Sequence, residues 1–123
     1  MAGSNINVNI PDWNAMDLKA VARSASAHKG IYTSTHDNII GQLATMTSNG
    51  ATSASLRLIQ STMDGLNAKY NLVKEAYAYI INKGDNETRE SFTQKSGAIT
   101  KEHNNLQQEY SSTIHQAELA MHR

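Results

Sequence analysis

The apolar residues between positions 56 and 80 follow one another at alternating steps of three and four. They are Leu56, Ile59, Met63, Leu66, Tyr70, Val73, Tyr77 and Ile80. An uninterrupted stripe with this period is typical of an amphipathic helix that packs along another helix. We therefore predict a helix over residues 53–83. Gly84 follows it and is expected to end it in the left-handed conformation that glycine adopts easily.

A second ridge of this helix is spaced at seven residues. It comprises Leu58, Gly65, Leu72 and Tyr79, and at about 100° per residue it lies about 130° around the helix from the first stripe. A helix with two such faces is expected to lie between two partners. They are either two other helices of its own chain, or its own chain and a neighbouring copy. Together with Phe92, this second ridge is the predicted interaction surface.

A second helix is predicted over residues 11–47. Pro11 suits its first turn, and Asp12 and Asp17 place negative charge at its positive end. Its stripe is formed by Leu18, Val21, Ala25, His28, Tyr32, Thr35, Ile39, Leu43 and Met46. Gly30 and Gly41 inside it indicate a close helix approach or a kink, or alternatively plain tolerance at exposed positions.

The two helices are joined by residues 47–53, a run of turn formers in which Thr52 or Ser53 can cap the next helix. Because a short link makes long helices antiparallel neighbours, we predict a helical hairpin. Its core residues are expected to be Leu18, Val21, Ile39, Leu43, Ile59, Met63, Leu66, Val73 and Ile80.

A third helix is predicted over residues 86–122, capped by Asp85 or Asn86. Its stripe follows an eleven-residue repeat, which does not wind in the left-handed sense of a heptad, and comprises Ile99, His103, Leu106, Tyr110, Ile114, Ala117 and Met121. Phe92 is the only large apolar residue of its first two turns, so it should pack more loosely than the hairpin. The predicted fold is all-α: one domain over residues 1–123, with residues 1–10 as an extended arm.

Composition excludes several classes of protein. Lys and Arg balance Asp and Glu at 11 each without a basic run, which argues against a nucleic-acid or anionic-membrane partner. The chain has no cysteine, and therefore no disulfide or thiolate chemistry. No apolar stretch approaches the roughly 18 residues of a membrane span. The first residues lack the pattern of a cleaved signal peptide, so we expect export without one or, alternatively, a cytoplasmic location.

Candidate chemistry is sparse. His115, Glu118 and His122 could present one face to a metal such as zinc, but a solvated helix end is the preferred interpretation. His28 is expected to be a buried, hydrogen-bonded histidine or, alternatively, a pH-sensitive contact. The chain has no Gly-x-Ser-x-Gly elbow and no glycine-rich phosphate loop. We therefore predict no enzyme activity, no metal site and no cofactor.

Two stretches carry a resemblance to a known family. The run from Val8 to Trp13, with its proline, acid and tryptophan, resembles the N-terminal arm of needle subunits of bacterial type III secretion systems. The run from Leu56 to Ser61, followed by Tyr70-Asn71-Leu72, is similar to the second helix of those subunits. The resemblance covers roughly residues 6–81. It implies a helical hairpin that is exported unfolded and polymerises into a hollow helical filament.

The chain continues for about 40 residues beyond that similarity, which fits a longer extracellular filament subunit of the same machinery. The leading hypothesis is therefore a self-associating structural subunit of a secreted helical filament, with other copies of itself and a secretion chaperone as partners. The alternative is a compact three-helix adaptor or chaperone-like module that binds a partner protein's helix.

Overall fold

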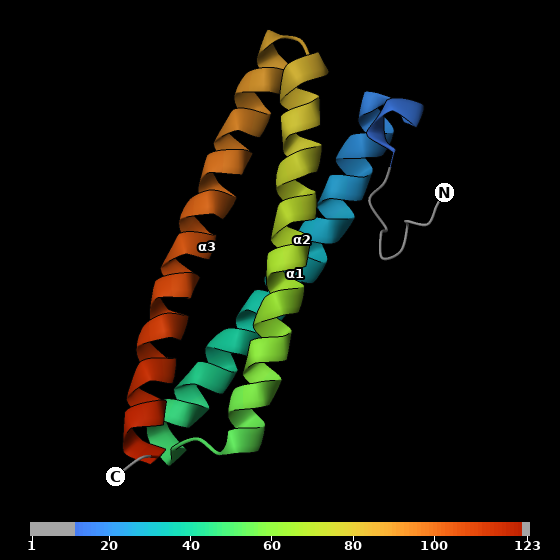
Figure 1. Ribbon diagram of the computed structural model, residues 1–123. Coiled ribbons are helices and arrows are strands. Elements are labelled where there is room, and N and C mark those ends of the chain that lie inside the picture. The colour runs from blue at the N-terminus through green and yellow to red at the C-terminus, as the bar shows by residue number, and fades with distance from the viewer. Residues whose placement is uncertain (1–11, 122–123) are drawn as a thin grey trace.

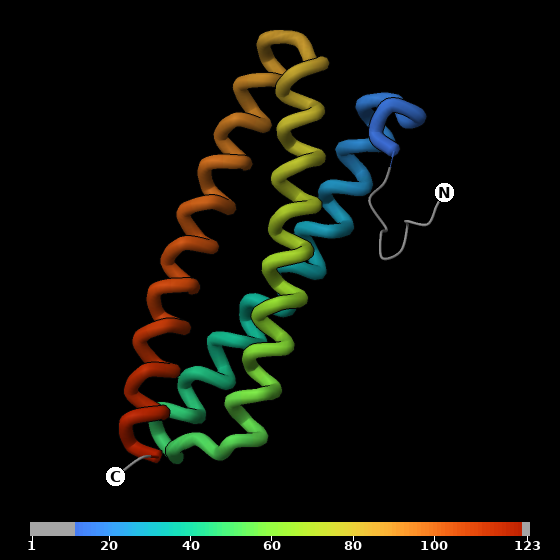
Figure 2. The backbone as a smooth tube through the Cα atoms, in the orientation of Figure 1, coloured from blue at the N-terminus to red at the C-terminus, as the bar shows by residue number. Residues whose placement is uncertain are grey.

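The computed structural model describes residues 12–121, which form three long helices. A 3-10 turn, η2 (Trp13–Ala15), precedes α1 (Leu18–Asn49), α2 (Ser53–Lys83) and α3 (Asn86–Met121). α1 and α2 run antiparallel, and α3 returns alongside α2 in the same direction as α1 (Figures 1 and 2). The predicted all-α fold, a hairpin with a third long helix, is confirmed. The predicted arm at residues 1–10 lies outside the described residues.

The first long helix begins at Leu18, which corrects the predicted start at residue 11. Asp17 has an extended backbone, and its carboxylate accepts a hydrogen bond from the Ala20 amide at 2.7 Å. Asp12 caps η2 separately by accepting from the Asn14 amide at 3.1 Å. The two aspartates thus cap two different elements, and the helical conformation is interrupted between them.

The link between α1 and α2 is short because both helix ends are capped. Gly50 has a φ of 84°, which favours glycine, and its amide donates to the Met46 carbonyl at 2.9 Å. Thr52 and Ser55 form a reciprocal capping box: each side chain accepts from the other's amide, at 3.0 and 2.8 Å. This local chemistry fixes the antiparallel hairpin.

The turn between α2 and α3 differs from the prediction at Gly84. Its backbone is extended, with φ −82° and ψ 170°, rather than left-handed. Glycine is favoured at this position for a steric reason: a Cβ here would lie 2.9 Å from both the Ile80 carbonyl oxygen and Thr88 Cγ2. Asp85 caps α3 by accepting from the Thr88 amide at 2.8 Å, and this hydrogen bonding lowers the pKa of the Asp85 carboxyl.

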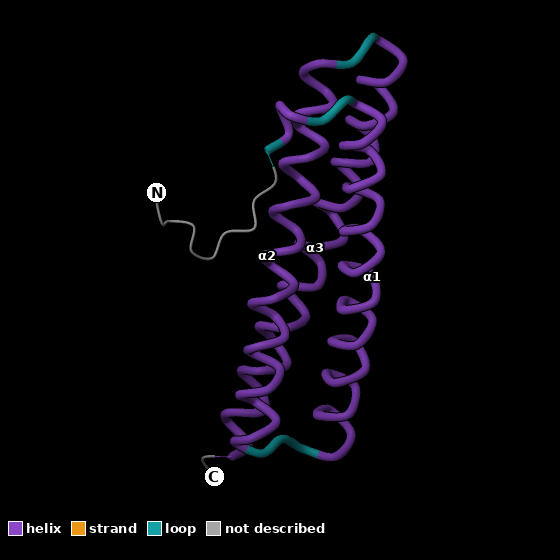
Figure 3. Tube along the Cα trace, turned by 90° about the vertical axis from the view of Figure 1, so that its right-hand side faces the viewer, coloured by secondary structure: helices purple, strands orange, loops and turns teal. Residues whose placement is uncertain are grey.

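The apolar core lies mainly along the contact between α1 and α2, the hairpin seam. α1 crosses α2 obliquely, so that α2 lies between α1 and α3 in the upper half of Figure 1 and α1 lies between α2 and α3 in its lower half, whereas Figure 3 views the three helices from the side. The buried apolar residues are Val21, Ala25, Tyr32, Ile39, Leu43, Met46, Ile59, Met63, Leu66, Val73, Ala76, Tyr77, Ile80, Ile99 and Leu106. Of the nine expected core residues, Leu18 is the one that is half-buried, at the edge of this cluster. α3 contributes only Ile99, Leu106 and the polar His103 to the buried set, so it is held by fewer contacts.

The two glycines inside α1 lie at exposed positions. A Cβ at Gly30 or Gly41 would meet no atom within 4 Å. This open space argues against a close helix approach at either glycine.

Candidate functional site

A cluster of polar side chains joins the three helices in the middle of the molecule. The Tyr32 hydroxyl of α1 lies 3.0 Å from His103 Nδ1 of α3, and His103 Nε2 lies 2.8 Å from Asn67 Oδ1 of α2. The Tyr70 ring stacks on the imidazole at 4.0 Å with an interplanar angle of 11°. We call Tyr32, Asn67, Tyr70 and His103 the polar cluster.

The hydrogen bonds of the cluster define the proton positions on His103. Asn67 Oδ1 can only accept, so His103 Nε2 carries the hydrogen and donates it. Nδ1 of the neutral ring is then an acceptor, and the Tyr32 hydroxyl donates to it. Both ring nitrogens are therefore satisfied in the neutral Nε2–H tautomer.

Burial shifts the acid–base properties of this cluster. Tyr32 is 0% and His103 3% exposed. Burial, reinforced by His36, lowers the pKa of His103, while Glu102 acts weakly in the opposite direction. Burial likewise raises the pKa of Tyr32 far above its ordinary value. Because these two groups are closed to solvent and already paired with each other, the cluster suits a structural role better than proton transfer to a substrate.

A second group of polar contacts holds α3 against α2. The Lys74 ammonium donates to Ser96 Oγ and Thr100 Oγ1, both at 2.7 Å, and the Tyr70 hydroxyl donates to Thr100 Oγ1 at 3.2 Å. Toward the α2–α3 turn, the Tyr77 and Phe92 rings meet edge to face at 5.6 Å. The predicted interaction residue Phe92 thus packs within its own chain.

The second ridge of α2 lies on the side of that helix roughly opposite to its α3 contacts, given the 3.6-residue turn. Leu58 is 60% exposed, Gly65 is exposed, and Leu72 and Tyr79 are half-buried. α3 therefore does not cover this ridge. Its most exposed apolar side chain, Leu58, lies near the end of the molecule where α1 meets α2.

The open face extends from α2 onto α1. Leu58 lines a shallow groove together with Asn38 and Thr45 of α1. Ile31, which is 49% exposed, lies on the same flank of α1, one heptad before Asn38. Apolar side chains of both hairpin helices are thus left facing outward on the side away from α3.

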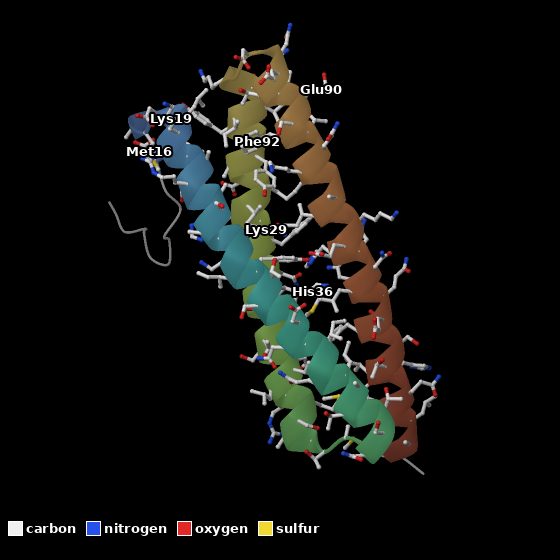
Figure 4. All side chains as sticks on the ribbon, turned by 180° about the vertical axis from the view of Figure 1, so that it is seen from behind. Met16, Lys19, Lys29, His36, Glu90 and Phe92 are labelled. Carbon is white, nitrogen blue, oxygen red and sulfur yellow. The ribbon has the colours of Figure 1, made fainter. Side chains whose placement is uncertain are left out.

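A separate groove of about 470 Å³ lies where the first half of α1 approaches α2 and α3. Tyr77 and Phe92 contribute apolar surface to it, and Lys29 and Lys95 also line it. Figure 4 labels Lys29 and Phe92. The Lys29 ammonium donates to Thr33 Oγ1 at 3.3 Å, and that of Lys95 lies 5.8 Å from the Phe92 ring centre. Both cations thus already have partners within the chain.

The predicted histidine positions fare differently. His115 and Glu118 are exposed, and His122 lies outside the described residues, within which no group of three potential metal ligands occurs. His28 is half-buried, with Lys69 Nζ 2.9 Å from its Nδ1. The deeply buried histidine is His103, which lies on the apolar stripe of the third predicted helix and had no predicted role. Its position between Ile99 and Leu106 was the available signal.

No helix within residues 12–121 is long and apolar enough to cross a membrane. Comparisons with protein families, curated proteins and solved structures find no match to this chain.

Proposed function

We propose that this chain is a self-associating structural subunit of a helical assembly. The observation that carries the proposal is the open second ridge of α2: α3 packs elsewhere, and Leu58 remains 60% exposed. An apolar surface that its own chain leaves uncovered commonly marks an interaction site. A second copy of this chain would cover it.

The shape of the subunit is compatible with continued growth. Three long helices form an elongated body (Figure 1). The seven-residue spacing of the second ridge places it along the length of α2. If the ridge contacts a different surface of the next copy, the contact does not close on itself and assembly continues into a fibre. The secreted, needle-like form of this proposal is supported by the sequence resemblance of Val8–Trp13 and Leu56–Leu72 to needle subunits.

A compact adaptor that binds a partner protein's helix is the second candidate. The groove between the first half of α1 and the other two helices favours it, because residues from all three helices line that groove. A groove lined by both apolar and charged residues, such as Phe92, Ile99 and Glu102, can receive an amphipathic helix.

Light scattering after size exclusion, over a concentration series, separates the two functions. Self-association predicts a mass that grows with concentration, and electron microscopy of the concentrated sample should show fibres. The variants Leu58→Asp and Leu72→Asp should abolish growth while helicity is retained. The matched control is Leu119→Asp, since Leu119 is 51% exposed but lies on α3.

Two outcomes of this experiment would contradict the proposal. A wild-type protein that stays monomeric at high concentration over varied salt and pH rejects self-association and favours the adaptor. If Leu119→Asp blocks growth as strongly as Leu58→Asp, the second ridge is not the contact surface.

A further inference from the structure

α3 is attached to the hairpin around a single buried histidine. His103 lies between Ile99 and Leu106, the only two apolar residues of α3 that are buried. Through its two ring nitrogens it contacts α1 at Tyr32 and α2 at Asn67. A change in the charge of this one ring therefore acts at the centre of the α3 contact.

Protonation of His103 is incompatible with the present hydrogen bonds. A second N–H at Nδ1 would face the Tyr32 hydroxyl, which now donates to that nitrogen, so the hydroxyl would have to turn and lose its acceptor. The imidazolium would also be a buried charge, and none of the residues from 12 to 121 forms an ion pair with it.

Charged and titratable groups from all three helices lie near the ring, and of these His36 favours its neutral form whereas Glu102 favours its charged form. From α1, Tyr32 and the half-buried His36 face it, with ring centres of those two side chains 6.0 Å apart. From α2, the Tyr70 ring stacks on the imidazole. The Tyr70 hydroxyl and the Lys74 ammonium both donate hydrogen bonds to Thr100 Oγ1 of α3. From α3 itself, Glu102 is the nearby carboxylate, but it is exposed.

We propose that His103 is a pH-sensitive latch: the α1–α2 hairpin holds α3 while the ring is neutral, and mild acid releases α3 from the hairpin. This inference is independent of the proposed self-association. The buried residues of the hairpin seam are apolar, and its histidine, His28, is only half-buried beside Lys69. The face of α2 that bears Asn67, Tyr70 and Tyr77 would become accessible on release.

The direction of the effect follows from proton linkage. Burial holds the pKa of His103 below its ordinary value of 6.5, so the α3-docked state binds fewer protons than the released state between these two pKa values. The docking contribution is complete above about pH 6.5 and is lost as the pH falls below it. One proton changes the docking equilibrium by up to about tenfold per pH unit.

Two measurements on the full chain test the latch, both at concentrations where the protein is monomeric. Nuclear magnetic resonance of the histidine rings should show His103 titrating below its ordinary pKa. Hydrogen exchange, corrected for the intrinsic effect of pH, should show that α3 loses protection between pH 7 and pH 5, by up to about tenfold per pH unit below pH 6.5. Protection along the α1–α2 seam should change much less.

Three variants assign the effect. His103→Gln should flatten the pH dependence of α3 protection. His115→Gln, at an exposed position of the same helix, should leave it unchanged. His28→Gln removes the histidine of the hairpin contact and should also leave the α3 response in place.

The latch is rejected if α3 protection is the same at pH 7 and pH 5, or if all three helices lose protection together in one transition. It is also rejected if the pH dependence persists in His103→Gln. Should that variant fail to fold, the ring titration and helix-resolved exchange of the wild-type protein still decide the question. Because the measurements use the monomer, failure of self-association would not affect them.

Discussion

Tyr32 and His103 are 71 positions apart in the sequence, and their side chains meet at 3.0 Å in the buried centre of the molecule. This hydrogen bond fixes the axial register of α3 relative to α1. Apolar stripes alone allow one helix to slide along another, whereas a buried polar pair is satisfied at one register only. The pair thus contributes specificity to a contact that contains little apolar area.

Replacement of Tyr32 by Phe should destabilise the protein by about 1–3 kcal/mol, because it leaves a buried acceptor on His103 without its donor. Urea unfolding followed by circular dichroism at neutral pH measures the loss. Tyr79→Phe is the control, since that ring lies half-buried on the second ridge, away from the polar cluster. Equal losses in the two variants would contradict the role assigned to the hydroxyl.

Two leucines of α2 provide a matched pair for the hairpin core. Leu66 is 0% exposed and Leu58 is 60% exposed, and both lie within the same helix. Leu66→Asp buries an unpaired carboxylate and should cost more than about 4 kcal/mol, enough to unfold a domain of this size. Leu58→Asp should retain the far-ultraviolet circular dichroism and cooperative melting of the wild type. A folded Leu66→Asp variant would reject the seam as the source of stability.

The helices and their seam could be predicted from the sequence because the responsible signals are local. The stripe through Ile59, Leu66 and Val73 repeats every few residues, and burial follows the same period. Thr52 and Asp85 likewise cap helices through contacts within three residues. Such features depend on neighbours along the chain and require no knowledge of the tertiary fold.

The position of α3 could not be predicted from the same signals. Its contacts on α2 include Asn67 and Lys74, whose polar side chains a hydrophobic pattern does not count. The apolar ridge through Leu58 and Leu72 was the visible second face, yet α3 packs on another side of the helix. Only the tertiary arrangement supplies the buried partner that makes His103 part of a polar cluster.

Gly84 precedes α3 and Gly97 lies within it. Replacing each by alanine should change the stability of the protein in opposite directions. At Gly84 a Cβ would lie 2.9 Å from a backbone oxygen, so Gly84→Ala should destabilise by about 1–3 kcal/mol through overpacking. Gly97 lies inside α3 with no atom within 4 Å of a Cβ. Gly97→Ala should therefore stabilise by about 0.5–1 kcal/mol. Thermal melting of both variants checks the signs, and a stabilised Gly84→Ala would show that the turn relaxes freely.

Stability should also fall in alkaline solution, because two tyrosines of the core are buried. Burial raises the pKa of both Tyr32 and Tyr77 above the ordinary value of 10.0. Between the unfolded and folded pKa values the folded state therefore holds more protons than the unfolded state. The contribution of each tyrosine is complete below about pH 10 and is lost as the pH rises further, by up to about 1.4 kcal/mol per pH unit.

Urea unfolding at a series of pH values from neutral to strongly alkaline measures this loss, while tyrosinate absorbance reports ionisation directly. Tyr77→Phe removes one titrating group and should make the alkaline decline less steep. Tyr79→Phe is the control for loss of a tyrosine hydroxyl outside the buried core, because Tyr79 lies half-buried on the second ridge. If Tyr32 and Tyr77 ionised in the folded protein as readily as in the unfolded chain, the unfolding free energy would show no decline from these residues. That result would contradict their placement in a closed core.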